Sequence, residues 1–74
     1  MADATPPAVS PQDRLVRDGF AEVAEAQVYL RLSRSTIYAL MDRGALPFAR
    51  FGRTRRIPWR SLRDYAAAQL VGVA

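Results

Sequence analysis

The first recurring pattern of hydrophobic positions lies between residues 20 and 32. Val23, Ala26 and Leu30 fall on one face at helical spacing, with Gln27 at its edge. Alanines and glutamate within this segment add good intrinsic helix propensity. The pattern therefore predicts a first helix from Phe20 to Leu32.

A second helical pattern follows directly and has a boundary signal at each end. Ser33 is a good N-cap, and Gly44 supplies the left-handed residue that often ends a helix. The segment Arg34–Arg43 between them carries an apolar stripe at positions i, i+3 and i+4, formed by Ile37, Leu40 and Met41. Two helices joined by a turn of about three residues form a helix-turn-helix.

A third helical pattern extends from Trp59 to Leu70. Its inner face is expected to hold Trp59, Leu62, Tyr65, Ala66 and either Gln69 or Leu70. Because Trp59 and Tyr65 share this face with Leu62, we expect them to supply core area rather than to stack on nucleic acid.

The segment between the second and third helices has the pattern of a β-hairpin. Residues 48–51 suit a strand, residues 52–54 form a turn that begins with glycine, and residues 55–57 suit the returning strand. Prolines at 47 and 58 bracket the pair, as they often do at strand ends. The predicted fold is mainly α with a small β-hairpin, a winged helix-turn-helix of three helices and a two-stranded wing.

The ends of the chain have a different composition from its middle. Residues 1–12 are rich in proline and small residues, so we expect residues 1–19 to form a flexible N-terminal arm, with one helical turn at 13–19 ended by Gly19. Residues 20–70 form the predicted domain and 71–74 a frayed tail. No apolar run is long enough to cross a membrane and no secretory signal is visible, so we expect a cytoplasmic protein without a membrane partner.

Basic charge is concentrated in the second part of the chain. The net charge is +4, but residues 1–30 hold two arginines and five carboxylates, whereas residues 31–74 hold nine arginines and only Asp42 and Asp64. Every basic residue is arginine, which binds phosphate and guanine in a bidentate fork. A GC-rich genome would also explain the absence of lysine, although it would not explain the clustering. The distribution predicts a polyanionic partner.

Two groups of polar residues are candidates for contacting that partner. The outer face of the second helix offers hydrogen-bonding groups for base edges, at Ser33, Arg34, Ser35, Thr36, Tyr38 and Arg43. The wing offers Arg50, Arg53, Thr54, Arg55 and Arg56, whose mutual repulsion favours a bound anion. The alternatives are a solvated helix face and a basic surface turn, and Thr36 could serve only the helix cap.

Catalysis is not expected from this composition. The chain has no histidine, cysteine or lysine to act as base, nucleophile or Schiff-base former, and it has no glycine-rich phosphate loop. Its carboxylates are scattered apart from Glu22 and Glu25, and Asp42 would either repel phosphate or orient Arg43. The sequence therefore predicts a protein that is not an enzyme and has no cofactor and no metal site.

Three motifs together resemble the excisionase family and, more broadly, the MerR-like winged-helix DNA-binding domains. They are Leu32-Ser33-Arg34-Ser35-Thr36-Ile37-Tyr38, then Arg43-Gly44-Ala45-Leu46-Pro47, then Gly52-Arg53 followed by Arg56-Ile57-Pro58. The resemblance covers residues 21–70. It departs from the family at Arg31, where many members have glycine, and at Gln27-Val28-Tyr29, where a small and an acidic residue are more usual.

The resemblance implies that the helix after Ser33 enters the major groove of double-stranded DNA. It also implies that the wing around Gly52 contacts the adjacent minor groove, with Arg56 turned toward the body of the domain. Such proteins bind neighbouring sites as several copies and bend DNA, which directs an integrase to excise a phage or mobile element. Arg31 would then alter the approach to DNA or add a phosphate contact.

Two other functions remain open at this stage. A transcriptional regulator of the same fold is the alternative, although we expect no effector domain and no long dimerising helix after the third helix. The basic face could also bind an acidic protein. Salt dependence separates these cases, because counterion release makes DNA binding steeply sensitive to salt.

Overall fold

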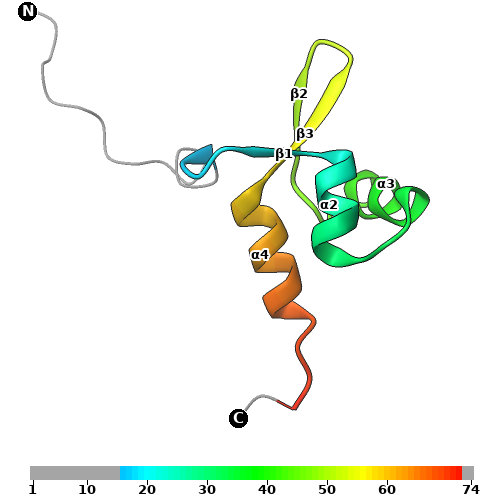
Figure 1. The fold of residues 1–74 in the computed structure, drawn as a ribbon, viewed down its shortest axis with the longest axis vertical. Helices are drawn as coiled ribbons and strands as arrows, with labels where there is room; N and C mark the ends of the chain where they lie inside the picture. Colours follow the sequence, from blue (N-terminus) through cyan, green and yellow to red (C-terminus); the bar gives the residue numbers. More distant parts are fainter. Residues whose placement is uncertain (1–15, 73–74) are drawn as a thin grey trace, which may run out of the picture.

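A computed structural model of the chain describes residues 16–72. In chain order its elements are β1 (Phe20–Glu22), α2 (Val23–Leu30), α3 (Arg34–Asp42), β2 (Ala49–Phe51), β3 (Thr54–Pro58) and α4 (Trp59–Ala68). The hairpin of β2 and β3 projects beyond the three helices, and α4 extends away from it on the other side (Figure 1). The predicted winged helix-turn-helix is confirmed. Most of the expected N-terminal arm and the last two residues of the expected tail lie outside the described residues.

The first helix is shorter than the sequence predicts, because its first three residues form a strand. Glu25 Oε1 accepts a hydrogen bond from the Glu22 backbone N–H at 2.8 Å, and this bond fixes the start of α2 at Val23. The residues before it are extended and pair with β3, in the register Phe20 with Pro58, Ala21 with Ile57 and Glu22 with Arg56. The prediction of a helix from Phe20 to Leu32 was therefore wrong at its N-terminal end, and the helix also ends two residues earlier than predicted, at Leu30.

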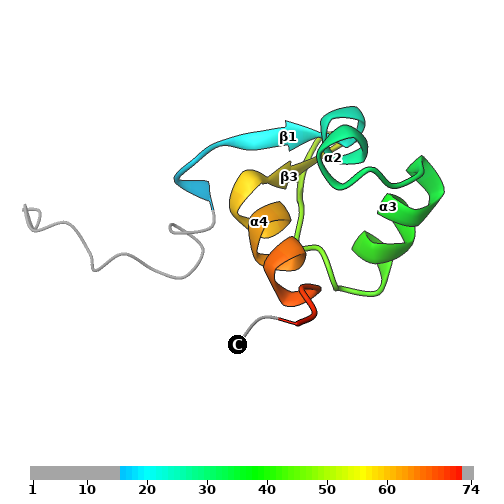
Figure 2. The same ribbon diagram turned by 60° about the horizontal axis from the view of Figure 1, so that its bottom comes forward.

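The sheet has three antiparallel strands in the order β1-β3-β2, so the wing is not a free two-stranded ribbon. Its base is anchored to β1, which lies beside β3 above α4 (Figure 2). The hairpin itself closes through Gly52 and Arg53, with Phe51 opposite Thr54. Gly52 has a φ of 63°, and glycine at the first position of a two-residue loop suits a tight hairpin.

The turn between α2 and α3 contains a non-glycine residue in the left-handed region. Arg31, the C-cap of α2, has a φ of 58°, and its position is where the related family often has glycine. The following Leu32 N–H donates to the Gln27 carbonyl, and Ser33 then caps α3. Arg31 therefore introduces backbone strain at the turn that connects the two helices.

The core lies where the three helices meet the inner side of the sheet. Ile37, Leu40 and Met41 are buried as predicted, and α4 contributes Leu62. Trp59 and Tyr65 pack partly against this core, which agrees with their expected structural role. The remaining buried hydrophobic residues are Ala21, Val23, Ala26, Leu46 and Ile57. The third helix ends at Ala68, so Gln69 and Leu70 are exposed rather than on its inner face.

Candidate nucleic-acid interface

A cluster of hydroxyl groups forms the exposed N-terminus of α3. Ser33 Oγ accepts a hydrogen bond from the Thr36 backbone N–H at 3.2 Å and lies 2.8 Å from Thr36 Oγ1. Ser35 Oγ lies 3.2 Å from the same Ser33 oxygen. Ser33 and Thr36 therefore serve the helix cap, while all three residues remain exposed at the end of the helix that carries positive partial charge.

Arg34 and Tyr38 form a pair one helical turn apart on α3. The Arg34 guanidinium donates to the Tyr38 hydroxyl at 3.2 Å, and its central carbon lies 5.1 Å from the ring centroid. Arg34 is exposed and Tyr38 half-buried. The pair restricts the Arg34 side chain before any partner binds, which lowers the entropy lost on contact.

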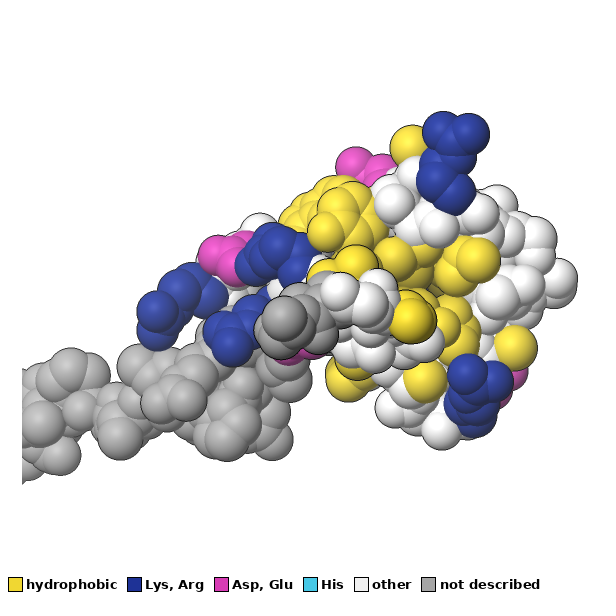
Figure 3. Space-filling view, turned by 90° about the horizontal axis from the view of Figure 1, so that it is seen from below, with side chains coloured by type: hydrophobic (Ala, Val, Ile, Leu, Met, Phe, Trp, Pro, Cys, Tyr) yellow, Lys and Arg dark blue, Asp and Glu magenta, His cyan; other side chains and the backbone are white. Residues whose placement is uncertain are grey.

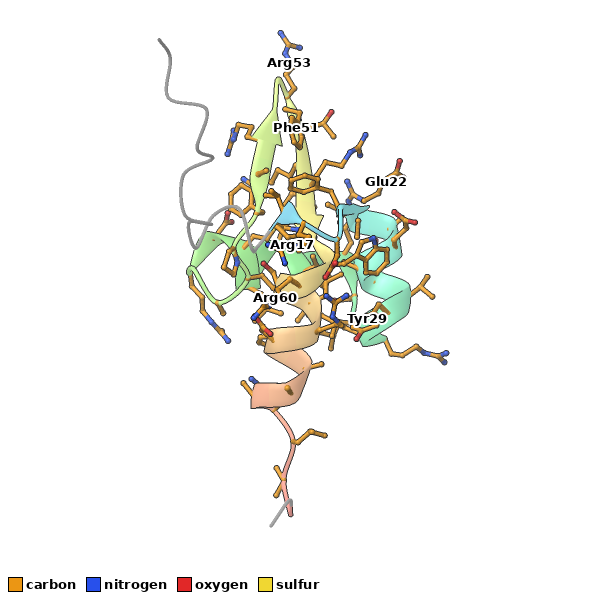
Figure 4. The ribbon with its side chains drawn as sticks, turned by 90° about the vertical axis from the view of Figure 1, so that its left-hand side faces the viewer. Arg17, Glu22, Tyr29, Phe51, Arg53 and Arg60 are labelled. Carbon is orange, nitrogen blue, oxygen red and sulfur yellow. The ribbon has the colours of Figure 1, made fainter. Side chains whose placement is uncertain are left out.

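The tip of the wing carries charge that extends away from the body. Arg53 lies at the end of the hairpin, beyond the rest of the side chains (Figure 4). Arg50, Arg53 and Thr54 are all exposed. Phe51, the last residue of β2 before the turn, packs edge-on against Phe20 of β1, with ring centroids 5.2 Å apart, and this contact restrains the hairpin.

A polar cleft of about 310 Å³ joins α3 to the wing. Arg34 and Tyr38 line it from α3, and Arg53, Thr54, Arg55 and Arg56 line it from the wing, so that six of the predicted site residues meet there. Glu22 adds one carboxylate from β1. The concentration of guanidinium groups makes this cleft suited to an anionic backbone.

Two of the wing arginines are paired with carboxylates of the body. Arg55 Nη1 lies 3.0 Å from Asp42 Oδ1 on α3, and Arg56 Nη1 lies 3.7 Å from Glu22 Oε2 on β1. Sequence reasoning did not find either pair, because the partners lie on elements far apart in the chain. Asp42 was expected either to repel phosphate or to orient Arg43, and its ion pair is with Arg55.

Arg43 lies apart from the other site residues. It is the C-cap of α3, at the opposite end from Ser33, and it lines a shallow pocket of about 360 Å³ against α4. Ser61 Oγ is buried in this pocket and has no hydrogen-bond partner among the described residues. Arg43 therefore lies on a different surface from the polar cleft between α3 and the wing.

The face at the α4 end of the molecule differs from the wing. Hydrophobic side chains are exposed there and arginines are scattered around them, as Figure 3 shows. Within residues 16–72, no group of carboxylates has the geometry of a metal site. No helix in that range is long and apolar enough to cross a membrane.

These features define a small winged helix-turn-helix protein with one basic face formed by α3 and the wing. The chain belongs to the helix-turn-helix domain family, whose model matches residues 22–70. This match covers more than half of the chain and includes every element of the fold except the start of β1. Helix-turn-helix domains bind DNA through the second helix of the motif.

A curated relative agrees with the resemblance drawn from the sequence. The chain is 47% identical over 45 residues to a probable excisionase of Saccharopolyspora erythraea. The aligned segment covers 61% of this chain and 46% of that protein, so the chain spans less than half of the relative's length. No solved structure gives a significant match.

Proposed function

We propose that this protein is an accessory factor that binds double-stranded DNA beside a recombination junction and bends it, so that an integrase excises a phage or mobile element. The observation that carries the proposal is the polar cleft between α3 and the wing, which Arg34 of α3 lines together with three arginines of the wing. The likeness to a probable excisionase supports the specific role.

In this proposal α3 lies in the major groove, and the wing lies along the adjacent phosphates and minor groove. Arg34 and Ser35 contact base edges, while Ser33, Thr36 and Tyr38 complete the helix surface. Arg50, Arg53 and Thr54 contact the backbone, and Arg55 and Arg56 shape the wing from within. Arg43, at the C-terminal end of α3 and outside the cleft, would reach only a phosphate beyond the main contact surface.

Affinity in this proposal comes from several copies bound side by side. A single module this small buries only about 600–1,000 Å² on DNA, which gives weak binding at physiological salt. Copies at a spacing of about one helical turn would raise affinity and selectivity together. In this proposal the integrase cleaves the strands, and the protein acts through DNA shape.

A footprint of the purified protein on its flanking genomic DNA, titrated at two salt concentrations, tests this function. We expect cooperative protection of several evenly spaced sites near an attachment-like junction, and a mobility change on circularly permuted fragments that reports a bend. Protection of one promoter-proximal site would indicate a transcriptional regulator instead. Absence of salt-sensitive protection would contradict DNA binding altogether and point to an acidic protein partner.

A further inference from the structure

The wing is connected to α3 through the side chain of Arg55. The Arg55 guanidinium carbon lies 5.0 Å from the Tyr38 ring centroid and 4.8 Å from that of Phe48. Its Nη1 also donates to Asp42 Oδ1 at 3.0 Å. Only 21% of the Arg55 side chain is exposed, so this cation is held by two rings and one carboxylate.

The same contacts continue on both sides of Arg55. Tyr38 also lies against the Arg34 guanidinium, and Phe48 lies 6.0 Å from that of Arg50. Arg50 is directly opposite Arg55 across the β2–β3 pair, where two like charges would otherwise repel. Asp42 supplies the negative charge beside these two arginines, and its side chain is 65% exposed on the outer side of α3.

We propose that Arg55 is a positioning residue that fixes the wing against α3, and that Asp42 strengthens DNA binding by holding Arg55 in place. The proposal rests on the DNA-binding function proposed above. Within that function it assigns a favourable role to an acidic side chain on the basic face. Arg55 does not contact phosphate, because doing so would break its ion pair and both ring contacts.

For removal of the Asp42 carboxylate, the proposal predicts a change in DNA affinity opposite to the one expected from charge alone. Removing a carboxylate beside a polyanion should tighten binding if charge alone matters. If the carboxylate holds the wing at the angle that DNA requires, its removal leaves the wing less ordered, and that order must be restored on binding. The two accounts therefore predict opposite changes in affinity for one substitution.

A double-mutant cycle on the full chain separates the two accounts. Asp42→Asn and Arg55→Gln are each expected to weaken binding to a cognate duplex roughly 5- to 10-fold, and the double variant is expected to bind no more weakly than either single variant. Asp42→Glu keeps the carboxylate and is expected to restore nearly full affinity.

Asp64→Asn is the matched control, because it removes the same charge from an ion pair with Arg60 on α4. We expect it to leave affinity unchanged or slightly higher. Tighter binding by Asp42→Asn would overturn the proposal. The proposal would also be overturned if the loss of affinity in Arg55→Gln added to that in Asp42→Asn and flattened the log–log dependence of affinity on salt by about 0.9. That change of slope indicates a lost phosphate contact.

A measurement without DNA keeps this test independent of the proposed function. The chain has no cysteine, so nitroxide labels on Ala39→Cys in α3 and Thr54→Cys in the wing report one distance. We expect a narrow distance distribution that Asp42→Asn broadens and Asp64→Asn does not. An unchanged width in Asp42→Asn would refute the positioning role, whereas failure of the parent protein to bind any DNA would refute only the proposed function.

Discussion

At the scale of single residues, Arg31 and Ser33 determine how the two helices of the helix-turn-helix are joined. Arg31 adopts a left-handed backbone, and Ser33 caps the next helix two residues later. A left-handed conformation costs a residue with a Cβ roughly 1–2 kcal/mol, whereas glycine adopts it readily. The turn therefore keeps a residue that is unfavourable for folding, which is expected where a side chain has another use.

Substitution of Arg31 with glycine is expected to stabilise the fold by about 1 kcal/mol, because it relieves the left-handed strain at a φ of 58°. The measurement is urea denaturation, in which the midpoint should rise while the slope with denaturant stays constant. If Arg31 also contacts phosphate, the same variant should bind DNA more weakly with a flatter salt dependence. A lower midpoint would show that the arginine side chain stabilises the turn more than its backbone strain costs.

The wing arginines also differ as single residues, because some are exposed and others are paired with a carboxylate. The cluster in residues 50–56 could be recognised from the sequence, because four arginines lie close together at a predicted turn. The resemblance implied that Arg56 turns toward the body, but its pairing with Glu22 and the pairing of Arg55 with Asp42 could not be predicted. These pairings depend on carboxylates from α3 and β1, and neither proximity has a local signal in the chain.

At the scale of elements, the helices and strands were predicted best where the sequence has a strong hydrophobic period or clear boundary residues. Helix α3 has an N-cap, an apolar stripe and a terminating glycine, and its predicted bounds differ from the observed ones by a single residue. Strand β1 has only three residues, which is too few for a period, and its partner β3 lies far along the chain. The sequence therefore assigned Phe20–Glu22 to the following helix, because local propensity gave no reason to separate them.

The wing turn permits a test with a matched control. Gly52→Ala is expected to lower the free energy of unfolding by roughly 1–2 kcal/mol, since alanine is strained at a φ of 63°. An added Cβ meets no atom within 4 Å at Gly52 or at Gly44, which has a φ of 83° after α3. Gly44→Ala should therefore cost a similar amount of stability.

The two glycine variants should differ in DNA binding. At a temperature where both remain folded, Gly52→Ala is expected to weaken binding and reduce protection on the side of the footprint that the wing covers. Gly44→Ala should bind nearly as the parent does. Equal effects of the two variants on affinity would indicate that the wing turn makes no separate contribution.

At the scale of the whole molecule, arginines lie both at the tip of the wing and on α4, at opposite ends of the fold. The wing tip carries Arg53, whereas Arg60 lies on α4 well away from it (Figure 4) and pairs with Asp64 at 3.5 Å. Long-range attraction depends on the sum of these charges, but counterion release depends on which of them reach phosphate.

Arg53→Ala and Arg60→Ala remove the same charge from these two places. Arg53→Ala is expected to weaken binding to specific and random duplexes alike and to flatten the log–log salt dependence by about 0.9. Arg60→Ala should leave that slope unchanged. Titrations at four or more salt concentrations provide the measurement, and a slope that falls equally in both variants would show that the wing tip has no preferred contact with phosphate.

The sheet order β1-β3-β2 also has a consequence for synthesis of the chain on the ribosome. The central strand β3 is the last of the three to be translated, and residues 20–22 must wait for residues 56–58 before they have a partner. The core similarly lacks Leu62 until α4 emerges. Contacts this distant in sequence are closed late, so we expect the two helices of the helix-turn-helix to stay incompletely packed in the nascent chain. The ordered basic face would thus form in one cooperative step after α4 has been translated, and under the proposed function a nascent chain stalled before β3 would be unable to occupy DNA.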